Sequence, residues 1–208
     1  MHKGDLREFF HVLIHPCEGF DELSAHKRGS PLLAAVSVAA LFLSTLLERF
    51  FLAFRFNTYS TENTNVFLVL VATVGLVLVA TAANWALSTL WDGKADLRMI
   101  FIVFGYAMAP YTLGLLLRTG LSHLCTIEDG ALLSVVTAAC TLWAGLVLWF
   151  GLLQAQEYTV GKNLACLVGT AVGMLLILFL CFLVMLLFQQ LWEFLYSLYD
   201  EIVLRIRL

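Results

Sequence analysis

The sequence predicts an all-α membrane protein, in which five transmembrane helices form a bundle with amphipathic interfacial helices at both ends. The first observation is the composition. Hydrophobic residues make up 61% and charged residues 13% of the 208 residues, and the mean hydropathy is +0.90. Soluble domains carry about 45–50% apolar and about 25% charged residues. The chain therefore has too few charged side chains to cover a water-soluble body of this length.

The second observation is the number of long apolar stretches. A helix needs about 20 consecutive apolar residues to cross a bilayer. The stretches that reach this length are residues 32–54, 66–91, 99–117, 131–153 and 164–188. None of them shows the alternation of polar and apolar residues that is typical of membrane barrels. We therefore expect five helical spans.

Charged residues and His are nearly absent from these stretches, where they occur only as Glu48 and Arg49 at the end of the first. Ionisable residues within a membrane mark proton relays and ion pathways, so their absence counts against a pump or a proton-coupled carrier. A net charge of −3 and a pI near 5.9 argue against nucleic acid as a partner, because it requires clustered positive charge. The lipid bilayer is the partner that the composition predicts.

The Lys and Arg residues predict the orientation, because cytoplasmic loops carry an excess of both. With the N-terminus inside, seven of them fall on the inner side and five on the outer side. We therefore expect a cytoplasmic N-terminus and an external C-terminus. We divide the chain into a cytoplasmic amphipathic segment (1–30), a five-span membrane domain (31–188) and an amphipathic C-terminal helix (189–208).

An amphipathic pattern precedes the first span. Its apolar residues recur at helical spacing and are Leu6, Phe9, Phe10, Leu13 and Ile14. This pattern is typical of a helix that lies in the membrane interface, and Pro16 should end it.

A second apolar stripe follows the fifth span and consists of Leu191, Leu195, Leu198, Ile202 and Ile206. Glu201 and Arg205 stand four residues apart in the order that favours a helical ion pair. No Gly or Pro separates this segment from the fifth span. It either continues that helix out of the bilayer or lies in the interface, and the sequence favours neither.

Two short loops share a Gly-Lys pair just before the next span. The first loop contains Asp92, Gly93 and Lys94, and the second contains Lys162 and Asn163. Asp-Gly indicates a turn, and the lysines suit positive anchors that reach lipid phosphates. Neither loop has the Gly-x-x-x-x-Gly-Lys-Ser/Thr pattern of a nucleotide-binding loop. We interpret both loops as contact sites at the cytoplasmic face.

The third span contains Gly105, Tyr106 and Pro110. Pro110 cannot donate a hydrogen bond to the carbonyl of residue 106, so we expect the helix to bend there. Gly105 allows a neighbouring backbone to approach. The Tyr106 hydroxyl needs a partner at this depth, and Asn84 in the second span is one candidate. The segment is either a packing kink or a hinge with a small polar pocket.

In the fifth span, Gly169 and Gly173 form a G-x-x-x-G pair. Such a pair lets two helices approach closely. The pair packs either within the bundle or between two protomers of a homodimer.

Motifs of catalysis are missing from the sequence. It contains no H-E-x-x-H, G-x-S-x-G or C-x-x-C pattern. An enzyme needs positioned titratable groups in a cleft, and the candidates here lie only in loops. We therefore predict no catalytic, cofactor-binding or metal site.

Several motifs together resemble a known family. In chain order they are Pro16 to Phe20, Trp85 to Trp91-Asp92-Gly93-Lys94, Gly105-Tyr106-x-x-x-Pro110, Trp149, Glu157-Tyr158 to Lys162-Asn163, and Tyr199-Asp200-Glu201-Ile202-x-x-Arg205. Their order and spacing are similar to those of the Yip family of Ypt/Rab-interacting membrane proteins. The short bacterial branch is the more similar one, because residues 1–30 lack the long acidic tail of the eukaryotic members.

The resemblance implies five spans with a cytoplasmic N-terminus. It also implies a membrane-protein partner, which would be a component of a carbohydrate ABC transporter in a bacterium or a small GTPase in a eukaryote. The bacterial plasma membrane is the expected location, in preference to the endoplasmic reticulum or Golgi.

Two hypotheses for the function follow. The first is a non-enzymatic scaffold or accessory protein that acts through protein or lipid contacts, in membrane traffic or beside a transporter. The alternative is a small permease or channel for a neutral solute, with Tyr106 and Asn84 lining the path.

Overall fold

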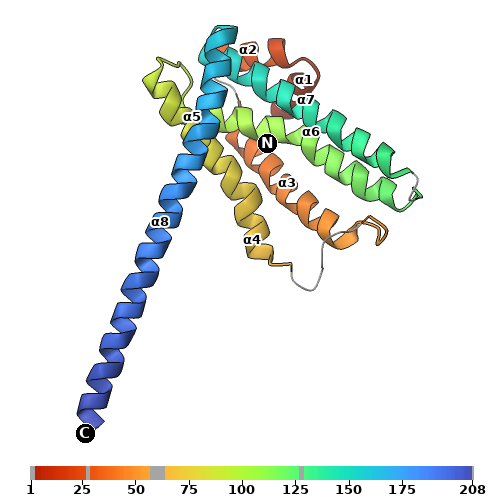
Figure 1. Cartoon of the computed structure of the whole chain (residues 1–208). Coiled ribbons are helices and arrows are strands. Elements are labelled where there is room, and N and C mark those ends of the chain that lie inside the picture. Colours follow the sequence, from red (N-terminus) through yellow and green to blue (C-terminus); the bar gives the residue numbers. More distant parts are fainter. Residues whose placement is uncertain (1–2, 27–28, 57–63, 127–128, 208) are drawn as a thin grey trace.

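The computed structural model describes residues 3–26, 29–56, 64–126 and 129–207, with side chains from residue 6 to residue 201 apart from residues 26–28, 57–63 and 127–128. Every regular element in these ranges is a helix (Figure 1). The helices are α1 (Lys3–Ile14), α2 (Pro16–His26), α3 (Pro31–Phe51), α4 (Val66–Leu70), η2 (Val71–Gly75), α5 (Leu76–Leu90), α6 (Leu97–Ser122), α7 (Gly130–Gln156) and α8 (Val160–Arg207).

Five of the described helical segments are long and apolar enough to cross a membrane. They are Pro31–Phe51, Val66–Leu90, Leu97–Ser122, Gly130–Gln156 and Val160–Glu201. The predicted all-α membrane bundle of five spans is thereby confirmed, and the chain is a multi-pass membrane protein. The ends of the spans differ from the predicted ones by a few residues, except in α8, which is much longer.

Helix α6 lies at the centre of the bundle, between α3 and α7 (Figure 1). Its residues Ile100, Val103, Tyr106 and Ala107 are at most 1% exposed. Small residues allow α3 and α6 to approach closely. Gly105 has no side chain, and a Cβ atom added there would lie only 2.6 Å from the Cβ of Ala34 in α3. Close backbone approach of this kind is the usual way in which membrane helices pack.

The second span consists of three consecutive helical segments, α4, η2 and α5. The side chain of Asn65 caps its start, where Oδ1 accepts hydrogen bonds from the backbone N–H of Phe67 (3.0 Å) and Leu68 (3.2 Å). Segment η2 is a single π-helical turn that ends at Gly75. Such turns are rare insertions within α-helices, and the apolar pattern did not predict it.

The N-terminal segment contains two helices where the sequence predicted one. Helix α1 ends at Ile14, as the following Pro16 led us to expect, but α2 begins at that proline. The fixed φ of proline suits the first position of a helix. Val12, Phe20 and Leu23 are at most 3% exposed, so both helices pack against the bundle, α2 mainly against α7.

Helix α8 continues without a break from Val160 to Arg207. The structure therefore favours the first of the two alternatives for the C-terminal segment, of which residues 189–207 extend the fifth span as one helix. At about 1.5 Å per residue, its 48 residues measure about 72 Å, more than twice the hydrocarbon thickness of about 30 Å. From Leu178 to Glu201 every residue is exposed, and this part extends away from the bundle (Figure 1).

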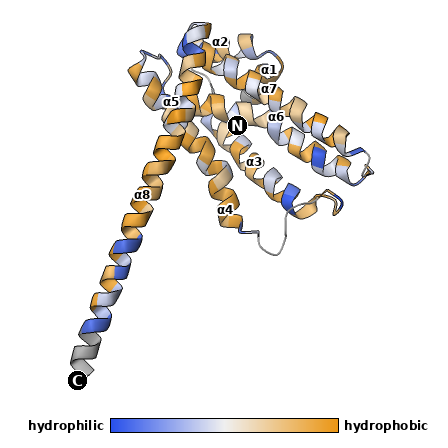
Figure 2. Ribbon diagram, in the orientation of Figure 1, coloured by the Kyte–Doolittle hydropathy of each residue, from blue (hydrophilic) through white to orange (hydrophobic). Residues whose placement is uncertain are grey.

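Hydropathy along α8 changes beyond the fifth predicted span. Beyond its first turn, the part nearer the bundle is mostly apolar, whereas hydrophilic residues occur again towards the C-terminal end (Figure 2). Gln189, Gln190 and Glu193 begin this more polar part. An apolar, exposed surface is expected where a helix faces lipid chains, so its exposure needs no protein partner.

Candidate functional site

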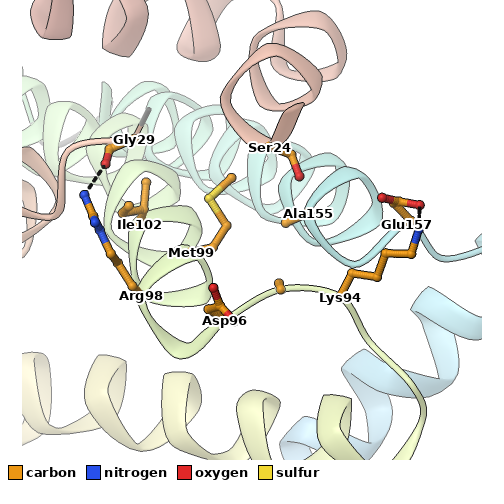
Figure 3. A pocket seen from close by; sticks show the side chains of 10 residues that line it. Ser24, Gly29, Lys94, Asp96, Arg98, Met99, Ile102, Ala155 and Glu157 are labelled. Carbon is orange, nitrogen blue, oxygen red and sulfur yellow. Dashed lines mark hydrogen bonds and ion pairs between the residues drawn. The ribbon is translucent and has the colours of Figure 1, made fainter. Parts of the chain in front are cut away.

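Two short loops meet at one end of the bundle. Residues 91–96 connect α5 to α6, and residues 157–159 connect α7 to α8. We call residues 91–96 and 156–163 the loop cluster. An ion pair between Lys94 and Glu157 joins the two loops (Figure 3). The sequence had predicted similar roles for the two loops, and the structure brings them together.

The first loop makes a tight turn at Asp92 and Gly93. Asp92 has a φ of 52°, in the left-handed region, and the N–H of Gly93 donates a hydrogen bond to the carbonyl of Ser88 (2.8 Å). A Cβ atom at Gly93 would lie 2.6 Å from the hydroxyl of Tyr158. The predicted Asp-Gly turn is therefore present, and the glycine is what allows the second loop to lie against it.

Tyr158 and Asn163 fix the second loop, but Lys162 and Asn163, which were predicted as loop contacts, lie in the first turn of α8. The Tyr158 hydroxyl donates a long hydrogen bond of 3.5 Å to the carbonyl of Trp91, and burial raises the pKa of its phenol. The ammonium of Lys162 lies 4.6 Å from the centre of the Tyr158 ring, within cation–π distance. Asn163 is fully buried and donates to the carbonyl of Trp149 (3.1 Å).

A buried polar network connects the loop cluster to the spans. Gln156 Oε1 accepts a hydrogen bond from the N–H of Ala95 (3.4 Å), and Gln156 Nε2 donates to Asn84 Oδ1 (3.3 Å). Asn84 Nδ2 in turn donates to Thr170 Oγ1 (2.9 Å) and contacts Cys166 Sγ (3.6 Å). The network therefore links α5, α7 and α8 beneath the loops.

The sequence reasoning missed Gln156. It is 1% exposed and joins the first loop to Asn84. The available signal was a glutamine at the end of an apolar stretch, next to a loop. Its partners could not be read from the sequence, because Asn84 lies 72 residues away.

The partners that the structure gives Asn84 differ from the suggested one, Tyr106. The hydrogen bonds of Asn84 run to α7 and α8, as described above. Tyr106 instead packs its ring edge-on against Phe9 of α1, with 4.8 Å between ring centres. Both side chains are almost completely buried, and they occupy different helix interfaces.

Close packing explains the remaining small residues of the predicted sites. Gly105 lies against α3. Gly169 and Gly173 lie against α5, where added Cβ atoms would meet Leu87 at 2.5 Å and Ala83 at 3.4 Å. Of the two alternatives for the G-x-x-x-G pair, the structure therefore shows packing within the bundle. Pro110 lies inside α6, which continues to Ser122, and the bend expected there stays a prediction.

A cavity of about 460 Å³ adjoins the loop cluster. Ser24 of α2, Asp96 and Arg98 at the start of α6, and the Lys94–Glu157 pair line its polar part, and Met99, Ile102 and Ala155 line its apolar part (Figure 3). Arg98 Nη2 donates to the carbonyl of Gly29 (3.3 Å). The N-terminal segment, the first loop and the end of α7 thus enclose one pocket.

The opposite end of the bundle holds an ion pair that the sequence reasoning did not predict. Arg118 Nη1 of α6 lies 2.8 Å from Glu48 Oε1 of α3, and the glutamate side chain is only 8% exposed. Nearby, a ring nitrogen of His123 lies 2.7 Å from the carbonyl oxygen of Phe51. The predicted third span ends at residue 117, whereas α6 continues past Arg118 to Ser122.

The predicted C-terminal pair Glu201–Arg205 lies in the last turns of α8, and the side chain of Arg205 lies outside the described residues.

In the connection before α7, hydrogen bonds from Thr126 hold the pKa of Asp129 below its usual range. In the described residues, His, Cys, Asp and Glu form no group of three or more that could hold a metal ion.

The five spans and the loop cluster define a multi-pass, all-helical membrane protein. A comparison with protein families identifies its group: the Yip1 domain matches residues 10–187 of the chain. The chain therefore belongs to the Yip family, as the order of its motifs had indicated. No curated protein and no solved structure matches the chain.

Proposed function

We propose that this Yip-family protein is a non-enzymatic scaffold or accessory protein that acts through its loop cluster. The observation that supports this most is the joining of two loops into one surface. Lys94 and Glu157 pair across 63 residues of sequence, and Gln156 bonds to the backbone of Ala95. A surface held by several contacts is preorganised, so its binding costs less ordering entropy.

We place this surface in the cytoplasm of a bacterial cell, with the C-terminus outside the plasma membrane. Lys94, Arg98 and Lys162 lie at the loop end of the bundle, and positive residues favour the cytoplasmic side. The partner is a second membrane-associated protein. In a bacterium it would be a component of a carbohydrate ABC transporter, in a eukaryote a small GTPase, and a second copy of the chain would make a homodimer.

Photo-crosslinking in native membranes tests the proposal. A crosslinking amino acid replaces Asp92, which is exposed in the loop cluster, and in a matched variant it replaces Arg55, which is exposed at the opposite end. We expect one discrete partner to be captured from position 92 and not from position 55. Equal capture from both positions, or capture of lipid alone, would contradict the proposal.

A flux assay on reconstituted protein tests the permease hypothesis. Solute flux that is lost in Asn84→Leu or Tyr106→Phe would make transport the function in place of scaffolding. We expect neither wild-type flux nor an effect of these substitutions on flux, because both side chains are buried at helix interfaces.

A further inference from the structure

We propose that the pocket beside the loop cluster binds a group that carries both a phosphate and a primary ammonium, as the headgroup of phosphatidylethanolamine does. The proposal deepens the proposed function, on which it rests, because it names a ligand of the same surface. It starts from four charged side chains around one cavity of about 460 Å³. Ligand pockets in proteins usually enclose about 300–1,000 Å³.

The charges of the pocket suit a zwitterion. Among the side chains that the structure describes, two cations, Lys94 and Arg98, and two carboxylates, Asp96 and Glu157, line it, and the formal charges of these four cancel. A purely anionic ligand would meet both carboxylates, and a purely cationic ligand would meet both cations. A molecule with one charge of each sign can pair favourably with both kinds of side chain.

The charged groups are distributed around the pocket. In Figure 3, Arg98 lies at one side near Gly29, the Lys94–Glu157 pair lies at the other, and Asp96 lies between them. Arg98 uses one N–H for the carbonyl of Gly29, and a guanidinium carries five N–H donors. Its remaining donors suit the oxygens of a phosphate, which arginine binds with two parallel hydrogen bonds.

The ion pair at the rim can rearrange to admit a ligand. The side chains of Lys94 and Glu157 are 66% and 59% exposed. Exposed ion pairs contribute little to stability, so Lys94 can turn to a phosphate and Glu157 to an ammonium at low cost. Asp96 precedes α6, and its side chain makes no capping hydrogen bond to that helix. It therefore offers a second acceptor for the ammonium.

The pocket favours a primary ammonium over the trimethylammonium of choline. Quaternary ammonium groups are recognised by cages of aromatic rings, and none of the lining residues in the described part of the chain is aromatic. Carboxylates and the hydroxyl of Ser24 accept hydrogen bonds, which a primary ammonium donates and a trimethylammonium cannot.

The position of the pocket favours a lipid as the source of this headgroup. Asp96 and Arg98 flank the first residue of a span, Leu97, and Ala155 lies at the end of another. The pocket is therefore at the level where spans leave the hydrocarbon. Met99, Ile102 and Ala155 supply an apolar wall, which suits the glycerol and the first acyl carbons.

Native mass spectrometry of the full-length protein tests the proposal, with added phosphatidylethanolamine, phosphatidylcholine or phosphatidylglycerol of identical acyl chains. We expect the ethanolamine lipid to bind about tenfold more tightly than the choline lipid, which corresponds to one hydrogen bond to a charged group. Equal retention of the three lipids, or preference for the anionic glycerol lipid, would overturn the proposal.

Two variants with matched controls locate the site. Asp96→Asn should abolish the preference for ethanolamine over choline, and Arg98→Gln should weaken retention of both. The controls are Asp21→Asn and Arg7→Gln, which change exposed residues of the N-terminal helices that do not line the pocket. If a control variant changes lipid binding as much as the corresponding pocket variant does, the pocket is not the site.

Competition with soluble glycerophosphoethanolamine shows whether the pocket takes the headgroup only from a membrane lipid or also from a soluble molecule. If it displaces the bound lipid at millimolar concentration and Asp96→Asn prevents this, the site takes the headgroup from either source. If it does not displace the lipid, the acyl chains are required and the ligand is the lipid. Circular dichroism shows whether each variant is folded. If the wild-type protein shows no lipid preference but its partner is still crosslinked from position 92, this inference is contradicted and the proposed function stands.

Discussion

The loop end and the opposite end of the bundle each hold an ion pair between segments far apart in the sequence, and the two pairs differ in burial. At the loop end, the side chains of Lys94 and Glu157 are 66% and 59% exposed. At the opposite end, those of Arg118 and Glu48 are 34% and 8% exposed. The difference indicates that the second pair serves the packing of α3 against α6, whereas the first is available for binding.

Burial sets the expected energies of the two pairs. Removing one partner of a buried pair costs about 3–5 kcal/mol, because the other charge stays in a low-dielectric environment. An exposed pair contributes about 0–1 kcal/mol. The following variants test whether the buried pair mainly affects the free energy of unfolding and the exposed pair mainly affects binding.

Arg118→Leu should have the largest effect on stability. It removes the guanidinium 2.8 Å from Glu48, and we expect a loss of about 3 kcal/mol of unfolding free energy. Thermal unfolding in detergent micelles measures it as a lower Tm. The double variant Glu48→Leu/Arg118→Leu should recover much of the loss, because neither charge of the pair is then buried without the other. A single variant as stable as the wild type would show that the pair is not structural.

Gly105→Ala should have the second largest effect, because it separates the same two helices. The new Cβ would lie 2.6 Å from Ala34 Cβ and 2.8 Å from its Cα, and overpacking of this kind costs about 1–3 kcal/mol. Gly145→Ala in α7 is the matched control, since nothing lies within 4 Å of its Cβ position. Tm should fall only for Gly105→Ala. An equal fall in both variants would point to a general intolerance of alanine.

Gln156→Leu should have a smaller effect on stability, at the loop end. It removes hydrogen bonds to Asn84 and to the N–H of Ala95, and hydrogen bonds between membrane helices contribute about 0.6 kcal/mol on average. We expect a small fall in Tm and faster hydrogen exchange in residues 91–96. Gln154→Leu, a half-buried position in the same turn of α7, is the control. Unchanged exchange in Gln156→Leu would show that the network does not hold the loop.

Lys94→Gln should have the smallest effect on stability, less than about 1 kcal/mol. The same change should nevertheless alter binding at the loop cluster, measured as crosslinking from position 92. A large fall in Tm would mean that the exposed pair is structural, and the contrast between the two ends would disappear.

The spans could be predicted because the bilayer imposes a length and a composition on each of them. Only a run of about 20 apolar residues satisfies both, and the predicted first residue of the second span, Val66, is the observed one. The Asp92-Gly93 turn was also predictable, because it depends on local backbone geometry. The second N-terminal helix could not be predicted in this way, because a proline both ends one helix and suits the first position of the next.

The contacts between helices could not be predicted from one sequence. Periodicity shows which face of a helix is small or polar, but not which helix lies against it. Glu48 and Arg118 are separated by 70 residues, and either could have faced the membrane surface. Asn84 was correctly chosen as a buried polar residue, but Tyr106 lies at another helix interface. Gln156 stood at the border of a loop, where polar residues are usually exposed.

Accessibility labelling tests the central claim most directly, namely that the loop cluster faces the cytoplasm and the chain crosses the membrane five times. The native cysteines Cys17, Cys125, Cys140, Cys166 and Cys181 are first replaced by alanine. Single variants Asp92→Cys, Lys162→Cys, Arg55→Cys and Glu201→Cys are then treated with a membrane-impermeant maleimide in intact cells. We predict that positions 55 and 201 react, and that positions 92 and 162 react only after permeabilisation. Reaction of positions 92 and 201 from the same side of the membrane would contradict the account.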